Sequence, residues 1–233
     1  MKLRFLNLPI AIALLLTLSG CYDRLDMEEA AFTLVLGFDL DENGDLIIYS
    51  SIPAFNKNAK KKTQETIIHA PSPRAGRNKA AIRAIGVFQP RKLQVIVLSK
   101  HLVENKQEWF RYLDVFFRDG RNPLTSRVMV FDGQLRDLFK YQPKDKPILP
   151  LQLISLQESV NSSSLGVETT LQELQRTILD KGQTPALPQI NLDSELQLSR
   201  TALLNHEGRY TASLTMNETM LLRMLQKKLR LTN

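Results

Sequence analysis

A cysteine near the start of the chain is the residue whose surroundings most clearly indicate chemistry. Leu18 to Gly20 directly precede Cys21, the single cysteine among 233 residues. Lys2 and Arg4 come before an apolar run that is too short to span a bilayer, the pattern of an export signal. We therefore expect residues 1–20 to be a lipoprotein signal peptide and Cys21 to be the lipidated mature N-terminus. The alternative is an ordinary signal peptide with a chance cysteine.

The composition favours a folded, exported domain. Hydrophobic residues make up 43% of the sequence and charged residues 24%, which allows the chain to bury a core. Loss of Lys2 and Arg4 with the signal would lower the formal net charge from +7 to +5, which favours an anionic membrane surface. Export excludes nucleic acid as a partner. Beyond the signal, no apolar run approaches the roughly 18 residues of a membrane span.

Familiar catalytic and cofactor-binding motifs are absent from the sequence. It contains no Gly-x-Ser-x-Gly elbow, phosphate-binding glycine loop, His-Glu-x-x-His or Cys-x-x-Cys. His69, His101 and His206 lie far apart in the chain, so we interpret them as surface histidines rather than metal ligands. We therefore expect a non-enzymatic protein with no catalytic residue, no metal and no cofactor.

One acidic segment resembles the first half of a calcium-binding loop. Asp39, Asp41 and Asn43 place oxygen atoms at alternate positions, and Gly44 stands where such a loop turns sharply. Ser50 occupies the position that requires a bidentate glutamate. Because Asn-Gly is a preferred hairpin dipeptide, we interpret the segment as a β-turn.

Three further clusters each allow two interpretations. The aromatic residues Trp109, Tyr112, Phe116 and Phe117 favour core packing over a ligand platform. Lysines at 60–62 indicate a solvated loop or a contact with anionic headgroups or polymers. Apolar residues at 216, 220, 221, 224 and 225 either pack against the preceding hairpin or face a partner or a membrane.

The first part of the mature chain alternates β-rich and helical segments. Runs at 32–38 and 46–52 flank a turn and predict a hairpin, with a brief strand at 66–69 and a helix at 78–87. A buried strand at 93–98, an aromatic-faced helix around Trp109 and a strand at 128–131 follow. This succession predicts a βαβ unit with parallel strands.

The later part predicts helices and a second hairpin. Helices are expected at 135–141, 151–159 and 171–179, the last with a capping box formed by Thr170 and Glu173. Pro185 and Pro188 indicate a boundary, followed by strands at 196–204 and 210–214 and a helix from Met216 that is capped by Thr215 and Glu218.

We therefore expect an α/β fold of mixed α+β character, with a mixed sheet, a βαβ unit and flanking helices. Residues 21–185 would form an N-terminal domain, and residues 186–233 an incomplete second domain of hairpin plus helix. Such a short module rarely folds alone. It would dock on the first domain or be completed by strands from a longer parent or partner chain.

Several short motifs follow one another along the mature chain. They are Cys21 to Arg24, Leu36 to Asp39, Pro90 to Lys92, Leu113-Asp114 through Phe117 to Asp119, Leu187-Pro188, and Ser199 to Ala202 through Glu218. Their order resembles that of the spore germination lipoproteins, the Ger(x)C family of germinant-receptor C subunits. Family members usually carry tryptophan where this chain has Tyr22, and they continue through a third domain, so the resemblance implies a short form.

The resemblance implies a lipid-anchored, non-enzymatic subunit of a nutrient germinant receptor on the outer face of the spore inner membrane. It would act beside two integral membrane subunits and help couple nutrient sensing to germination. An exported solute-binding or scaffold lipoprotein is the alternative, although a solute binder would need two comparable lobes. An exported hydrolase would need a nucleophile or a metal group.

Replacing Cys21 with alanine should abolish retention of the protein on membranes. The acyl chains are the strong anchor that the sequence offers, each buried CH₂ contributing about 0.8 kcal/mol, whereas basic surface charge binds weakly and is screened by salt. Fractionation after a high-salt wash measures this, with Tyr22→Phe as the control. A Cys21→Ala protein that still sediments with membranes would contradict the anchoring argument.

Overall fold

The computed structural model describes residues 30–54, 61–83, 87–163, 165–180 and 182–226. The strands are β1 (Ala30–Phe32), β2 (Val35–Leu40), β3 (Leu46–Pro53), β4 (Thr63–Ala70), β5 (Val87–Gln89), β6 (Val95–Ser99), β7 (Arg127–Phe131), β8 (Ala186–Leu192), β9 (Leu196–Leu204) and β10 (Tyr210–Leu214). An eight-stranded sheet has the order β10-β9-β8-β7-β6-β2-β3-β4, and β1 pairs with β5 in a separate two-stranded sheet.

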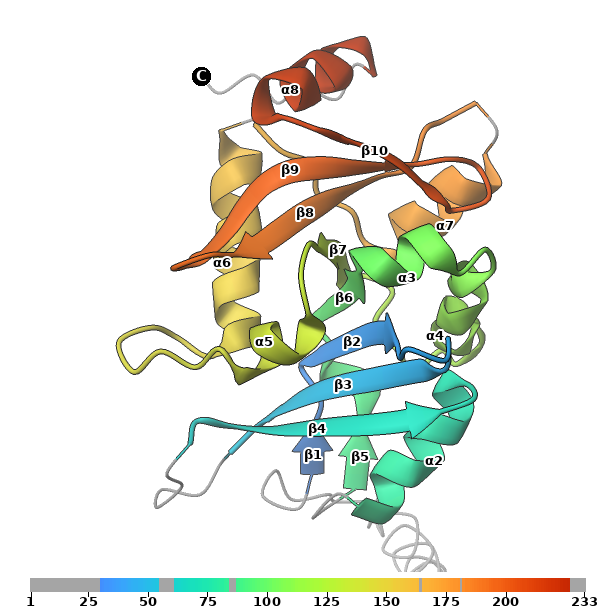
Figure 1. The fold of residues 1–233 in the computed structure, drawn as a ribbon, viewed down its shortest axis with the longest axis vertical. Helices are drawn as coiled ribbons and strands as arrows, with labels where there is room; N and C mark the ends of the chain where they lie inside the picture. The colour runs from blue at the N-terminus through green and yellow to red at the C-terminus, as the bar shows by residue number, and fades with distance from the viewer. Residues whose placement is uncertain (1–29, 55–60, 84–86, 164, 181, 227–233) are drawn as a thin grey trace, which may run out of the picture.

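Helices cover both faces of the large sheet (Figure 1). The α-helices are α2 (Pro73–Arg83), α3 (Lys100–Asn105), α4 (Asp114–Arg118), α5 (Leu135–Lys140), α6 (Leu149–Ser162), α7 (Leu171–Leu179) and α8 (Met216–Leu225). Two 3₁₀-helices, η1 (Pro90–Lys92) and η2 (Trp109–Leu113), complete the described elements. The expected α/β fold with a mixed sheet and flanking helices is confirmed.

The strands β2, β6, β7 and β8 form the parallel centre of the sheet. Side chains alternate between its two faces, so that Ile96 and Leu98 join one core and Val95 and Val97 join the other. Residues from α3, α4 and α7 pack on the first face, and residues from α5 and α6 pack on the second. Both faces are therefore buried, as a parallel sheet requires.

The predicted βαβ unit is confirmed, but its crossover is not one continuous helix. The chain leaves β6 through α3, continues through η2 and α4, and returns as β7, which is parallel to β6. Ser99 begins α3 by accepting a hydrogen bond from the amide of Leu102 at 2.9 Å. Trp109 and Phe116 are buried, which confirms the core interpretation of these two aromatic residues.

The first hairpin is confirmed, with β2 and β3 antiparallel and β4 added at the edge of the sheet. The strand expected at 66–69 is longer, because it pairs with β3 along its whole length. The helix expected at 78–87 begins earlier, at Pro73, because proline is compatible with a first helical turn and the hydroxyl of Ser72 accepts from the Ala75 amide. Its described part extends to Arg83, residues 84–86 lie outside the described residues, and Val87 belongs to β5. The side chains expected to form its buried face, at 80, 81, 84 and 85, lie outside those described.

The three helices predicted between β7 and β8 are confirmed, with bounds shifted by one to three residues for α5 and α6. Thr170 caps α7 by accepting from the amide of Glu173 at 3.2 Å. The second hairpin, β9 and β10, is confirmed as well, and its turn places Gly208 at a positive φ of 81°.

The segment from residue 186 continues the large sheet, because β8 pairs with β7 in parallel and with β9 in antiparallel orientation. The indole Nε1–H of Trp109 also donates to the carbonyl oxygen of Gly208 at 2.7 Å. Among the described residues, the hairpin thus contacts both the sheet and the crossover. The division into domains at residue 185 stays a prediction.

The buried face of helix α8 is formed by polar residues and not by its apolar stripe. The helix begins with the predicted capping box of Thr215 and Glu218. However, Thr219 and Arg223 are its buried residues, and they bond to the Thr201 hydroxyl and the Gly166 carbonyl. Of the two interpretations of the apolar stripe, packing of the whole stripe against the hairpin is wrong, since Leu221, Met224 and Leu225 are exposed. The hydrogen bonds of Thr219 and Arg223 hold this face of the helix against the protein, and Met216 at its start packs against the core.

No helix among the described residues is long and apolar enough to cross a membrane.

Replacing Gly37 with alanine should destabilise the fold by about 1–3 kcal/mol. A Cβ on this β2 residue would lie 2.7 Å from Cε2 of Phe139, whose ring is buried between α5 and the sheet. Gly120→Ala is the matched control, because a Cβ there meets nothing within 4 Å. Denaturant unfolding measures both variants, and equal midpoints would contradict the close packing of α5 on β2.

Candidate functional site

Cys21, the predicted lipidation site, lies outside the described residues, so its acylation stays a prediction. The first described element, β1, begins at Ala30. Any binding or catalytic arrangement that the structure shows must therefore come from the folded domain itself.

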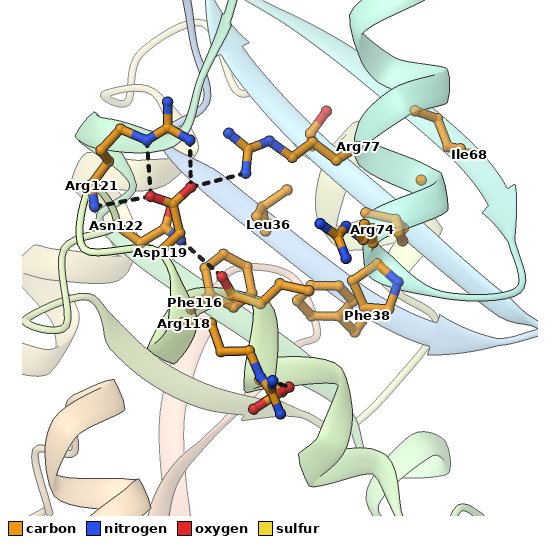
Figure 2. A pocket seen from close by; sticks show the side chains of 16 residues that line it. Leu36, Phe38, Ile68, Arg74, Arg77, Phe116, Arg118, Asp119, Arg121 and Asn122 are labelled. Carbon is orange, nitrogen blue, oxygen red and sulfur yellow. Dashed lines mark hydrogen bonds and ion pairs between the residues drawn. The ribbon is translucent and has the colours of Figure 1, made fainter.

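A pocket of about 460 Å³ lies between the large sheet and the helices α2 and α4 (Figure 2). Leu36 and Phe38 of β2, Ile48 of β3 and Ile68 of β4 give it an apolar floor, and Phe116 of α4 forms one wall. The rings of Phe38 and Phe116 meet edge to face, with centroids 6.3 Å apart. Its volume is typical of small-molecule sites, which range from roughly 300 to 1,000 Å³.

Helix α2 approaches the floor of this pocket closely because it carries a glycine. A Cβ at Gly76 would collide with Cδ1 of Ile48. The glycine therefore lets the backbone of α2 lie against β3, and the side chains of Arg74 and Arg77 extend from this helix over the apolar floor (Figure 2).

The rim of the pocket contains a shared carboxylate. Nε and Nη2 of Arg121 donate to the two carboxylate oxygens of Asp119 at 2.9 and 2.8 Å, and Nη1 of Arg77 lies 3.3 Å from Oδ2. Hydrogen bonds from Arg121 hold the pKa of Asp119 well below its usual value. Asp119 therefore stays ionised and joins the segment after α4 to α2.

The remaining charged residues of the rim are unequally paired. Nε of Arg118 donates to Oδ2 of Asp114 at 2.5 Å, one turn earlier on the same helix. Arg74 forms no hydrogen bond or ion pair with the residues that the structure describes. The lining thus includes four arginines against two aspartates. The pocket is apolar inside and positively charged at its opening.

A second polar group lies at the carboxyl ends of the parallel strands, where α/β sheets commonly bind ligands. Asp132, directly after β7, accepts from Nζ of Lys100 at 3.1 Å and from Nε2 of Gln189 at 2.8 Å. Gln189 in turn accepts from Ser213, whose hydroxyl lies 2.7 Å from that of Tyr210. These groups bond to one another and connect β7, β8 and β10.

Ser99, Asp39 and His101 form a third group, at the ends of β2 and β6. The Ser99 hydroxyl donates to Oδ1 of Asp39 at 2.5 Å, and Nδ1 of His101 lies 3.8 Å from the same oxygen. In a serine hydrolase the hydroxyl would bond to the imidazole, which removes its proton. Here the hydroxyl bonds to the carboxylate and caps α3, so the arrangement is structural.

The segment that resembles a calcium loop is a hairpin turn, as predicted. Oδ1 of Asp41 accepts from the amides of Asn43 and Asp45 at 2.9 and 2.8 Å. The hydrogen bond from the Asp45 amide lowers the pKa of Asp41. His69, His101 and His206 are exposed, and no cluster of three or more metal-ligating side chains is found among the described residues. Absence of calcium binding stays a prediction.

The lysine run contacts the protein at one point in the described structure. Nζ of Lys62 donates to the carbonyl oxygens of Lys144 and Lys146 at 3.3 and 3.0 Å. Lys60 lies outside the described residues. A contact with anionic headgroups stays an alternative.

The charged rim of the pocket is not apparent from the sequence. Arg74 and Arg77 are spaced to share one side of a helix, and Asp119 lies close to Arg121 in the chain. The proximity of the α2 arginines to Asp119 and Arg121 arises because α2 and α4 lie beside the same three strands. Periodicity along one segment does not carry that information.

Glu65 is a partly buried carboxylate on the edge strand β4. Its Oε1 accepts from Oγ of Ser51 and from Nε2 of Gln142, both at 3.0 Å. Its Oε2 is buried and has no hydrogen-bond partner in the described structure. Burial raises the pKa of Glu65 above its ordinary value of 4.5.

Comparisons with known proteins give three findings. Residues 23–192 match the family described as the spore germination protein N-terminal domain. Over 153 residues the chain is 26% identical to spore germination protein A3 of Bacillus subtilis (strain 168). This alignment covers 63% of this chain and 40% of that protein. The crystal structure of the GerBC protein is similar at 15% identity with a TM-score of 0.40, covering 88% of this chain and 59% of that chain. The chain thus spans less than two thirds of either relative.

Replacing Glu65 with glutamine should raise the melting temperature at about pH 7. Because the folded pKa of Glu65 is raised, the contribution of this residue to stability is greatest below pH 4.5, where the carboxyl is protonated, and is lost as the pH rises through the raised pKa. The gain should therefore shrink as the pH falls to about 4. Glu42→Gln, at an exposed turn position, is the control. A Glu65→Gln gain that does not vary with pH would contradict the desolvation argument.

Proposed function

The chain belongs to the Ger(x)C family of spore germination proteins, and on this premise we propose that it is a lipid-anchored subunit of a nutrient germinant receptor. The proposed place is the outer face of the spore inner membrane, beside two integral membrane subunits. The proposed role is to help couple nutrient sensing to germination.

The position of the family match, directly after the predicted lipidation site, is the observation that carries this proposal. The family domain begins at residue 23, directly after the predicted lipidation site Cys21 and Tyr22. A diacylglyceryl group carries two acyl chains, which together anchor a protein stably where a single chain binds only marginally. Lipidation at Cys21 would therefore hold the domain against the membrane surface, close to proteins that span the bilayer.

Binding without catalysis is supported by the polar groups of the described domain. Ser99 directs its proton to Asp39 rather than to an imidazole. At the carboxyl ends of the parallel strands, Asp132 accepts hydrogen bonds from Lys100 and Gln189. These side chains hold elements of the fold together, which favours a structural and binding role for the subunit.

Purification from dormant-spore membranes tests the proposal. A C-terminally tagged chain, expressed in the organism that encodes it, should co-purify with two multi-spanning membrane proteins after mild cross-linking and detergent extraction. Deleting the gene should slow germination in response to nutrients while leaving spore formation intact.

The Cys21→Ala variant provides the control, because it should lose both the membrane proteins and the germination response. Recovery of the wild-type protein alone, or with enzymes of the cell wall, would contradict the receptor role. Mass spectrometry of the purified material distinguishes these results.

A further inference from the structure

We infer that the pocket between α2, α4 and the sheet is a binding site for a small organic carboxylate with an apolar body. The inference concerns the folded domain and does not depend on the receptor role. Its two parts are an apolar floor that would bury the body of the ligand and an excess of guanidinium groups that would bind the carboxylate.

The apolar part follows from the strands that form the floor. Leu36, Phe38, Ile48 and Ile68 line the pocket, and each is less than a tenth exposed. Phe116 adds an aromatic face from α4. Contact with these side chains would remove chiefly the hydrocarbon surface of the ligand from water, which gives about 25 cal/mol per Å².

The excess positive charge of the pocket follows from the way in which the arginines and aspartates of its rim pair. Asp114 binds Arg118, and Asp119 binds Arg121 with both carboxylate oxygens. Those four side chains balance in charge. Arg77 has one contact with Asp119, at 3.3 Å, and Arg74 has none with the described residues.

Arg74 and Arg77 are therefore the side chains whose N–H donors can bind an anion. They lie three residues apart on α2, so their side chains leave the same side of the helix. A guanidinium presents parallel N–H donors that match a carboxylate, and such charge-assisted bonds are about twice as strong as neutral ones. A neutral or cationic ligand with the same body would lack this interaction.

Asp119 limits the strength of binding in this arrangement. Its carboxylate lies within reach of Arg77 and competes with an incoming anion for that side chain. Removal of this charge should therefore strengthen carboxylate binding, whereas removal of Arg74 should weaken it. Opposite effects of two neighbouring substitutions are difficult to attribute to general loss of structure.

Titration calorimetry with 2-naphthoate tests the inference. The full lipidated chain, held in phosphatidylcholine nanodiscs, should bind 2-naphthoate saturably and bind the isosteric neutral 2-naphthamide at least about ten-fold more weakly. Acetate, which has the carboxylate without the body, should not bind measurably. The corresponding cation, 2-naphthylmethylammonium, should not bind either.

Matched variants assign the binding to the pocket. Arg74→Gln should weaken 2-naphthoate binding about ten-fold without changing 2-naphthamide binding, and Asp119→Asn should strengthen it several-fold. Arg209→Gln is the control, an exposed arginine in the β9–β10 turn that does not line the pocket. Thermal melts of all variants confirm folding, since Arg74 is an exposed side chain.

Three results would overturn the inference. One is the absence of 2-naphthoate binding to the wild-type chain. The second is equal affinity in Arg74→Gln and Arg209→Gln. The third is complete displacement of 2-naphthoate when phosphatidylglycerol replaces phosphatidylcholine in the nanodiscs, which would make a membrane lipid the occupant.

Discussion

The central strands of the large sheet are apolar on both faces, and the arrangement of the helices follows from the need to cover both. Val95 and Val97 of β6 require α5 and α6 on one side, and Ile96 and Leu98 require α3, α4 and α7 on the other. At the β2-β3-β4 end, α2 and α4 leave an apolar region of the first face open to a pocket. The proposed binding site is thus a region where the helices do not completely cover the first face of the sheet.

Several polar residues in this protein connect elements that are distant in the chain. Asp132 connects the end of β7 to Lys100 in α3 and to Gln189 in β8, and Ser213 extends the same network to β10. Gln189 is the buried member of this network, and a buried amide costs free energy unless it is paired, so its hydrogen bonds to Asp132 and Ser213 favour this position of β10 on the sheet. Residues that could be mistaken for a catalytic cluster instead determine the register of the fold.

Local patterns in the sequence predict most strands and the caps of α7 and α8, but neither α3 nor the central strand β8, which lies where Pro185 and Pro188 indicate a boundary. The Asn43-Gly44 turn and the caps at Thr170 and Thr215 depend on residues within four positions of each other, so the sequence contains the whole signal. The start of α2 is less apparent from the sequence, because a proline such as Pro73 is typical of loops as well as of a first helical turn.

Non-local arrangements could not be predicted in the same way. The crossover around Trp109 divides into η2 and α4 because its aromatic side chains reach a core whose shape is set by other strands. The ion pair of Arg77 with Asp119 joins residues far apart in the chain, and no spacing rule relates them. The outward orientation of Leu221 and Leu225, which are 56% and 84% exposed, likewise depends on the hydrogen bonds of the opposite face of α8.

The hydrogen bond from Trp109 to Gly208 makes Trp109 an intrinsic fluorescence probe of the C-terminal hairpin. Trp109 is the single tryptophan of the sequence, and its fully buried indole touches the turn between β9 and β10. Separation of that hairpin from the crossover would expose the indole to water and shift its emission to longer wavelength. Fluorescence from one natural residue can therefore follow the attachment of the C-terminal hairpin, in solution or on a membrane, without any added label.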